Sequence, residues 1–332
     1  MDQHLNILVQ SSDFYAPFAG VMLTSLFENN QDITQITIYL MTFNMSDKNR
    51  SRFQILAEQY HRELKFIDTK EIDSFLEKHH VSRHRGAYTT YYKIFALSAI
   101  KDDIDRLIYL DSDMVVTGSL SELMNYDLSN NPLGMCIDVL TSKYKRLLKL
   151  DSLLYYNAGM IIFDVKKWIE CRGMDRIIEH ISTVHSVYPH VDQDLLNIVC
   201  LDSIATIPQK YNCYPVIYLY RDYNLLKKSC GLVNYYSEAE VISARQEPAI
   251  LHAIEVFGIR PWHDGVHPYK EVWRKYLSIS PWNDFTFLQC KVSVFSRMQG
   301  LLFKIMPKKF FAIVNSNCIY ILLFWKSKKC EL

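Results

Sequence analysis

The segment Leu107-Ile108-Tyr109-Leu110-Asp111-Ser112-Asp113 decides the fold prediction. Its run of apolar residues is typical of a central strand in a parallel sheet, which is buried on both faces. Two carboxylates follow directly, and positions i and i+2 of an extended chain face the same way. We therefore expect Asp111 and Asp113 to share one divalent cation, because Mg²⁺ and Mn²⁺ prefer oxygen ligands and neutralise a pyrophosphate.

The D-x-D pattern alone has little specificity, because it occurs at three places in the chain. The other two are Asp103/Asp105 and Asp192/Asp194. Only the pair at 111 and 113 follows an apolar strand, so the metal site is predicted there. Asp103 and Asp105 are predicted to lie in a solvated loop.

The segments around this strand alternate between strand and helix patterns. Strands are predicted at 5–9, 36–41, 64–67 and 106–110, and helices at 17–30, 46–61, 68–80 and 90–100. This alternation predicts an α/β domain whose ligands gather at the carboxyl ends of the strands. Further on, strands at 133–137 and 158–163 and a helix at 192–201 follow a less regular order, which predicts a mixed or antiparallel extension of the sheet.

Composition and missing motifs exclude several classes of protein. The chain has 332 residues, of which 49% are hydrophobic, so it can bury a sizeable core. No G-x-G pair is present, which excludes the dinucleotide fingerprint and the P-loop. The eight cysteines form no C-x-x-C pair and the start of the chain is polar, so reduced thiols in a cytosolic protein are expected.

The C-terminal region differs in charge from the rest of the chain. Between Phe285 and Cys330 there are eight Lys/Arg and no acid, although the whole chain has a net charge of only +1. We place a boundary near Ser280, with a catalytic domain at 1–280 and a basic, aromatic segment at 281–332. Such a segment is typical of an anionic membrane interface, and a C-terminal helix packed on the domain is the alternative. Nucleic acid is not expected as a partner, because the bases concentrate in a hydrophobic tail.

Four motifs together resemble one known family. They are LIYLDSDMVV (Leu107–Val116), YYNAGMIIFDVKKW (Tyr155–Trp168), VDQDLLN (Val191–Asn197) and ILH with RPWH (Ile250–His263). In this order they resemble the retaining glycosyltransferases of family 8, and within it bacterial lipopolysaccharide galactosyl- and glucosyltransferases. The resemblance implies a GT-A fold, a Rossmann-like mixed α/β sheet flanked by helices. It also implies transfer of galactose or glucose from a UDP-hexose to a saccharide or lipid-linked acceptor in lipopolysaccharide, O-antigen or related glycan synthesis.

The resemblance also implies roles for residues at matching positions. Asp111, Asp113 and His252 match the ligands of Mn²⁺ (or Mg²⁺), although His252 taken alone would be a core histidine. Ser112 is assigned to the donor site together with these acids. Asp138, Asn157 and Asp192 match positions beside the reacting sugar, whereas their local alternatives are a strand-entry turn and a helix N-terminal carboxylate.

The remaining donor-binding residues follow from the same comparison. Ala158 and Gly159 are small enough for the backbone to approach the sugar. Arg260 stands where the family has a diphosphate-binding Lys, and Gly258 is assigned to the phosphate.

The chain departs from the family pattern where the uridine is expected. Ser12 and Phe14 occupy the usual Asp and Asn places, so Ser12, Asp13 and Tyr15 are the expected uridine contacts. Lys93 replaces a uracil-contacting Arg. The amide that the family places on the β face of the donor is expected to be replaced by Val191.

The expected mechanism is same-face attack by the acceptor hydroxyl, with a covalent intermediate on Asp192 or Asp138 as the alternative. The expected location is cytoplasmic, peripheral on the inner face of the plasma membrane.

A phosphohydrolase is disfavoured because Val115 stands where such enzymes have Thr. The other competing function is a catalytically inactive UDP-sugar-binding or scaffold subunit, which the altered uridine segment favours.

Overall fold

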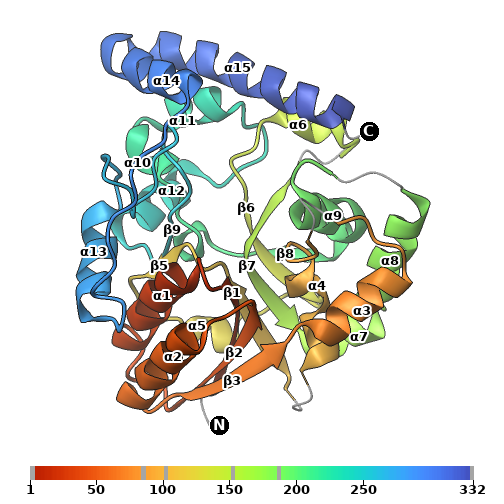
Figure 1. The fold of residues 1–332 in the computed structure, drawn as a ribbon. Coiled ribbons are helices and arrows are strands. Elements are labelled where there is room, and N and C mark those ends of the chain that lie inside the picture. Colours follow the sequence, from red (N-terminus) through yellow and green to blue (C-terminus); the bar gives the residue numbers. More distant parts are fainter. Residues whose placement is uncertain (1–3, 84–86, 101–103, 151–153, 185–187, 330–332) are drawn as a thin grey trace.

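A seven-stranded sheet with the order β3-β2-β1-β4-β7-β6-β8 forms the centre of the molecule and is flanked by helices (Figure 1). The computed structural model describes residues 4–83, 87–100, 104–150, 154–184 and 188–329. The strands of this sheet are β1 (His4–Ser12), β2 (Gln35–Phe43), β3 (Glu63–Asp68), β4 (Arg106–Leu110), β6 (Leu133–Ile137), β7 (Tyr156–Asp164) and β8 (Ile204–Thr206). Asp103 and Cys330 lie outside the described residues.

Helices connect and cover the strands. In the first half these are α1 (Ala16–Glu28), α2 (Asp47–Gln59), α3 (Lys70–Lys78), α4 (Tyr92–Ala99) and α5 (Ser121–Met124). The middle of the chain forms α6 (Ser142–Leu147), α7 (Val165–Glu170), α8 (Gly173–Thr183), α9 (Val191–Cys200), η1 (Leu201–Ser203), η2 (Gln209–Tyr211), α10 (Val216–Leu219), α11 (Tyr223–Cys230) and α12 (Glu238–Gln246). The last helices are α13 (Lys270–Ile279), α14 (Val294–Ile305) and α15 (Lys308–Lys329).

The strand directions match the prediction. β3, β2, β1 and β4 are parallel neighbours, whereas β7 runs antiparallel to both β4 and β6. The predicted α/β half and its mixed extension are therefore confirmed. The described cysteines are free thiols, as expected.

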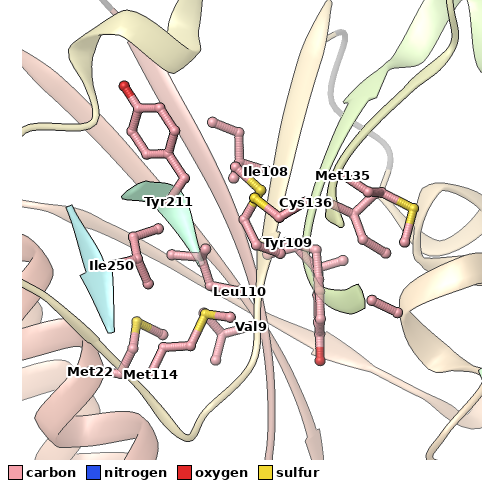
Figure 2. Packing of buried hydrophobic residues seen from close by; sticks show 14 of the residues in the cluster. Val9, Met22, Ile108, Tyr109, Leu110, Met114, Met135, Cys136, Tyr211 and Ile250 are labelled. Atoms are coloured by element: carbon pink, nitrogen blue, oxygen red, sulfur yellow. The ribbon is translucent and has the colours of Figure 1, made fainter. Parts of the chain in front are cut away.

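A second, two-stranded sheet was not predicted. It pairs β5 (Met114–Val116) with β9 (Ile250–His252) in antiparallel register. Figure 2 shows Met114 and Ile250 of this small sheet in the same hydrophobic cluster as Val9 of β1 and Leu110 of β4. The two sheets therefore share one core, which fixes the small sheet against the carboxyl ends of β1 and β4.

Residues just after Ser280 remain packed on the domain. The Trp282 side chain is 1% exposed, and its ring lies 4.6 Å from that of Phe53 on α2. A Cβ added to Gly20 of α1 would lie 2.2 Å from the Trp282 ring, so α1 and this indole are in close contact. The predicted boundary at Ser280 thus falls inside a packed unit, because the first aromatic residues beyond it fill the core.

The end of the chain forms two helices that differ in their packing. α15 packs on α11 and α6, across the top of the view in Figure 1, and its Phe311 and Ala312 are buried. α14 instead exposes an apolar stripe at helical spacing, formed by Val294, Met298, Leu301 and Ile305. The alternative expectation, a C-terminal helix packed on the domain, therefore describes the start of α15. In contrast, α14 has an exposed apolar face. The side chains of Leu322–Trp325 are outside the described part.

Within the residues that the structure describes, no helix combines the length and apolar character required to traverse a bilayer.

The burial of Trp282 predicts a large effect of its removal. Trp282→Ala should lower the free energy of unfolding by about 3–5 kcal/mol, since it empties a core site that α1 and α2 cannot refill. Urea unfolding measures this change. The control Val266→Ala, at a side chain that is 88% exposed, should stay within about 0.5 kcal/mol of wild type. A wild-type midpoint for Trp282→Ala would contradict the described packing.

Candidate active site

The register of the small sheet brings the predicted metal ligands together. Met114 of β5 pairs with His252 of β9, and the Ala253 N–H donates to the Asp113 carbonyl over 2.8 Å. The His252 Nε2 atom consequently lies 3.3 Å from Asp113 Oδ1 and 3.8 Å from Asp111 Oδ2. One ligand atom from each of the three residues lies within 4.8 Å of the others.

The two acids do not approach through an extended strand, contrary to the prediction. β4 ends at Leu110, and Ser112 and Asp113 form a turn that leads into β5. The Asp111 N–H donates to the Gly159 carbonyl of β7 over 2.8 Å, and the Ser112 hydroxyl donates to the Gln10 carbonyl of β1. The turn is therefore anchored on both neighbouring strands.

This donor set fits a divalent cation. The Nδ1 atom of His252 lies 2.9 Å from Asn212 Oδ1, so Nδ1–H donates and Nε2 keeps its lone pair for a metal. Asn212 Nδ2 in turn donates to Asn157 Oδ1 over 2.9 Å, which supports this orientation of the amide. Two carboxylates and one imidazole suit Mn²⁺ or Mg²⁺.

Gly159 lies so close to His252 and Asp111 that any larger residue would collide with their side chains. A Cβ at this position would lie 2.5 Å from His252 Cε1 and 2.9 Å from Asp111 Oδ2. Its neighbour Ala158 accepts a bond from Lys93 and donates its N–H to Gln193. Close packing against Asp111 and His252 therefore explains why the predicted N-A-G motif has a glycine at position 159.

Asp113 is held ionised by two basic partners. Burial alone would raise the pKa of its carboxyl group, but His252, when it is protonated and holds no metal, and Arg260 keep the pKa below its usual value by their charges and hydrogen bonds. Arg260 Nη1 donates to Asp113 Oδ2 and also to the Ala253 carbonyl. The predicted diphosphate-binding guanidinium therefore lies directly beside the metal site.

Lys93 lies at the centre of the site, where it bridges two acids. Its Nζ atom lies 3.2 Å from Asp111 Oδ1 and 3.0 Å from Asp192 Oδ2. Burial would lower the pKa of Lys93, but the two carboxylates raise it above its usual value. The assignment of Lys93 to the uracil does not describe this placement, because both of its ionic partners are acids of the metal and sugar region.

Two of the residues predicted beside the sugar, Asp138 and Asn157, form a hydrogen-bonded cluster with Gln193, whereas Asp192 pairs with Lys93. Asp138 Oδ2 accepts from Asn157 Nδ2 over 2.8 Å and from Gln193 Nε2 over 3.0 Å. Gln193 Oε1 accepts from both Asn157 Nδ2 and the Ala158 N–H. The amides of β7 and α9 thus orient the Asp138 carboxylate at the end of β6.

Gln193 and Asn212 are site residues that sequence reasoning missed. The expected replacement of the donor-facing amide by Val191 is wrong, because an amide two residues later enters the cluster while Val191 is 4% exposed in the apolar core. The sequence could have indicated Gln193, because this residue lies between Asp192 and Asp194 at the start of a helix, where successive side chains point in different directions.

The two acids that flank Gln193 have different surroundings. Burial raises the pKa of Asp192, against the opposing effect of Lys93. Asp194 is fully buried and accepts hydrogen bonds from the hydroxyls of Tyr144 and Tyr155. Only Asp192 therefore faces the charged groups of the site.

The expected uridine contacts lie at the end of β1. The Asp13 carboxylate accepts from the Ser46 and Asn49 groups at the start of α2, and these bonds lower its pKa, the Ser46 side chain most. Ser12 Oγ accepts from the Tyr15 N–H over 3.4 Å, and the Tyr15 side chain is 45% exposed. In the described residues, the side-chain hydrogen bonds of Ser12 and Asp13 lie between the end of β1 and the start of α2.

Gly258 lies beside the C-terminal helices. It has a φ of +79°, and an added Cβ would lie 3.2 Å from Ser296 Cβ on α14. It also lines a cavity of about 440 Å³, whose walls include the Asp138-following loop (139–141), Ile254–Phe257, and Phe295 and Gln299 of α14. Gly258 thus belongs to this cavity, whereas Arg260 reaches the metal ligands.

Known proteins are similar to this chain over most of its length. General stress protein A of Bacillus subtilis is 26% identical over 290 residues, which cover 85% of this chain and 96% of that protein. A lipopolysaccharide 1,2-glucosyltransferase of Escherichia coli strain K12 is 25% identical over 293 residues, which cover 84% of this chain and 79% of that protein.

Solved structures share the fold. The galactosyltransferase LgtC in complex with donor and acceptor sugar analogs has a TM-score of 0.65 and 23% identity, and the match covers 83% of this chain and 96% of that one. The bifunctional glycosyltransferase WbbM has a TM-score of 0.70 and 20% identity, and the match covers 86% of this chain and 51% of that one. The GT-A fold inferred from the motifs is therefore confirmed.

The model of one family, glycosyl transferase family 8, matches residues 6–265, a range that contains the candidate metal ligands, the amide cluster and Arg260. The chain belongs to glycosyl transferase family 8.

Proposed function

We propose that this glycosyltransferase transfers galactose or glucose from a UDP-hexose, with retention, to a saccharide or lipid-linked acceptor of a surface glycan such as lipopolysaccharide. The observation that carries the proposal is the convergence of Asp111, Asp113 and His252 beside the Asp138–Asn157–Gln193 cluster. The diphosphate of a sugar nucleotide needs a cation site, and the hexose joined to it needs hydrogen-bonding side chains next to that site. The similar lipopolysaccharide glucosyl- and galactosyltransferases support the substrate class.

Each group of residues has a separate task in this proposal. Asp111, Asp113 and His252 hold Mn²⁺ or Mg²⁺, which when bound supplies positive charge for the leaving diphosphate. Arg260 exchanges its bond to Asp113 for phosphate oxygens, to which a guanidinium can donate in bidentate fashion. Asp138, Asn157 and Gln193 orient the hexose by accepting and donating hydrogen bonds.

The surroundings of the two candidate nucleophiles favour same-face attack. Asp192 is paired with Lys93, and Asp138 accepts from two amides, so both carboxylates are already engaged. A carboxylate so engaged is a weaker nucleophile toward the anomeric carbon. The acceptor hydroxyl is then the group that attacks.

The cavity beside Gly258 is the proposed entrance for the acceptor. It connects the loop after Asp138 with α14, so a glycan can reach the donor sugar from the side of the C-terminal helices. Its apolar lining also suits the non-sugar part of a lipid-linked acceptor.

The proposed location is the cytoplasmic face of the plasma membrane. The apolar stripe of α14 is flanked by Lys291, Arg297 and Lys304, and by Lys308 and Lys309 at the start of α15. An exposed apolar face edged by bases is attracted to anionic lipid by both hydrophobic and Coulombic forces.

Removal of one metal ligand tests the enzymatic proposal. Asp113→Ala should reduce Mn²⁺-dependent release of UDP from UDP-galactose and UDP-glucose by at least about 10²-fold, because the leaving diphosphate loses its counter-charge. A coupled UDP assay measures release, and calorimetry measures Mn²⁺ binding. Asp105→Ala, at the exposed acid of another D-x-D, is the matched control and should behave as wild type. Wild-type protein that binds UDP-hexose with Mn²⁺ but releases no UDP would favour the inactive-subunit alternative.

Charges placed in the α14 stripe test the membrane proposal. Met298→Glu with Leu301→Glu should abolish sedimentation with vesicles containing phosphatidylglycerol, since both side chains are more than half exposed and the folded domain does not depend on them. Val233→Glu with Ile242→Glu adds the same charge at exposed apolar positions elsewhere and should leave sedimentation unchanged. Equal vesicle binding by both double variants would contradict the assignment to α14.

A further inference from the structure

Asn212 connects the candidate metal site with the Asp138–Asn157–Gln193 cluster. Its Oδ1 atom lies 2.9 Å from His252 Nδ1, and its Nδ2 atom donates to Asn157 Oδ1 over 2.9 Å. The Asn212 side chain is 0% exposed, so these two bonds replace the water that the amide loses on folding. One buried amide therefore contacts a candidate metal ligand on one side and an amide of the cluster on the other.

The main chain next to Asn212 is fixed against β9. The Cys213 N–H donates to the Ile250 carbonyl over 2.8 Å, and the His252 N–H donates to the Cys213 carbonyl over 2.9 Å. The Cys213 thiol donates to the Ala244 carbonyl of α12. The segment that carries Asn212 is therefore anchored to both β9 and α12, which keeps the amide beside the imidazole.

Two other fully buried asparagines use their amides differently. Asn30 donates to the Leu26 carbonyl of α1 over 2.9 Å. Asn197 binds both main-chain groups of Tyr156. Those amides satisfy backbone groups, which is a structural role. The two bonds of Asn212 go to side chains of the site, so its position affects the chemistry as well as the fold.

The direction of these hydrogen bonds links the two parts of the site. Metal binding at His252 Nε2 requires the proton on Nδ1, so Asn212 must present Oδ1 to the imidazole. Its Nδ2 then faces Asn157, whose Oδ1 also accepts from the Gly159 N–H over 2.9 Å. With Oδ1 fixed in this way, Asn157 Nδ2 is left to donate to the Asp138 carboxylate. The orientation of one amide thus follows from that of the other.

We propose that Asn212 is a positioning residue that couples metal binding at His252 to the orientation of Asn157 in the sugar cluster. This inference rests on the proposed function. In the reverse orientation the Asn212 amide would donate to His252 Nδ1, and the proton would then occupy Nε2, where a metal binds. Asn212 therefore favours the metal-binding tautomer, and the same amide holds Asn157 Nδ2 toward Asp138.

Two variants of Asn212 in the full chain separate its two bonds. Asn212→Asp keeps an acceptor for the His252 Nδ1–H, as carboxylates beside metal-bound imidazoles do, but has no N–H for Asn157. Its Kd for Mn²⁺, measured by calorimetry without nucleotide, should rise less than about threefold, whereas kcat for UDP release should fall about 10- to 100-fold. Asn212→Leu has a similar size but neither polar group, so it should also raise the Kd for Mn²⁺ about 10- to 100-fold.

Asn30→Leu is the matched control for loss of a buried amide. It should lower Tm, since it leaves the Leu120 N–H without the acceptor Asn30 Oδ1. The folded protein should nevertheless keep the wild-type Kd for Mn²⁺. Thermal unfolding of all three variants shows whether each is folded at the temperature of the calorimetry.

The outcomes distinguish this inference from the proposed function. A wild-type Kd for Mn²⁺ in Asn212→Leu, a wild-type kcat in Asn212→Asp, or an equal loss of Mn²⁺ binding in Asn212→Leu and Asn30→Leu would each overturn the role of Asn212. Wild-type protein that binds neither Mn²⁺ nor Mg²⁺ would refute the metal site and this role with it. Wild-type protein that binds Mn²⁺ but releases no UDP would refute the enzymatic proposal, and the Mn²⁺ measurements would still test the bond between Asn212 and His252.

Discussion

The pairing of β5 with β9 is the constraint on which the site depends. It joins residues 114–116 to residues 250–252 by antiparallel register, so an imidazole far along the chain meets the acids that follow β4. Strands of three residues contribute few hydrogen bonds by themselves. Their stability comes from the shared core, in which Met114 and Ile250 pack with Val9 and Leu110 (Figure 2). The geometry of the candidate metal ligands is therefore a consequence of core packing.

Much of the fold follows from local sequence patterns, because long apolar runs such as 36–41 and 106–110 have only one stable place in an α/β sheet. The acids at 111 and 113 were found for the same reason, although the turn that joins them was not. His252 came only from the family resemblance, since a three-residue strand has too little periodicity to identify. Gln193 was missed and Lys93 was assigned to the uracil because their contacts are long-range, from Gln193 to Asp138 and Ala158 and from Lys93 to Asp111 and Asp192, which no local pattern contains.

The C-terminal region combines two physical roles that composition could not separate. Trp282 fills the core between α1 and α2, whereas Met298 and Leu301 remain uncovered. All three are large apolar residues of the segment 281–332, which the sequence analysis treated as one unit. Tertiary packing alone distinguishes the residues that complete the domain from those available to a lipid surface.

The contact of α15 with α6 joins the C-terminal helix to the middle of the chain (Figure 1). α6 begins four residues after Asp138, and Lys143 links it to Asn317. A displacement of α15 would therefore reach α6, and α6 directly follows the loop after Asp138, the acid proposed to orient the sugar. Truncation of the last helix would therefore remove a support of α6, which lies only a few residues from Asp138 along the chain.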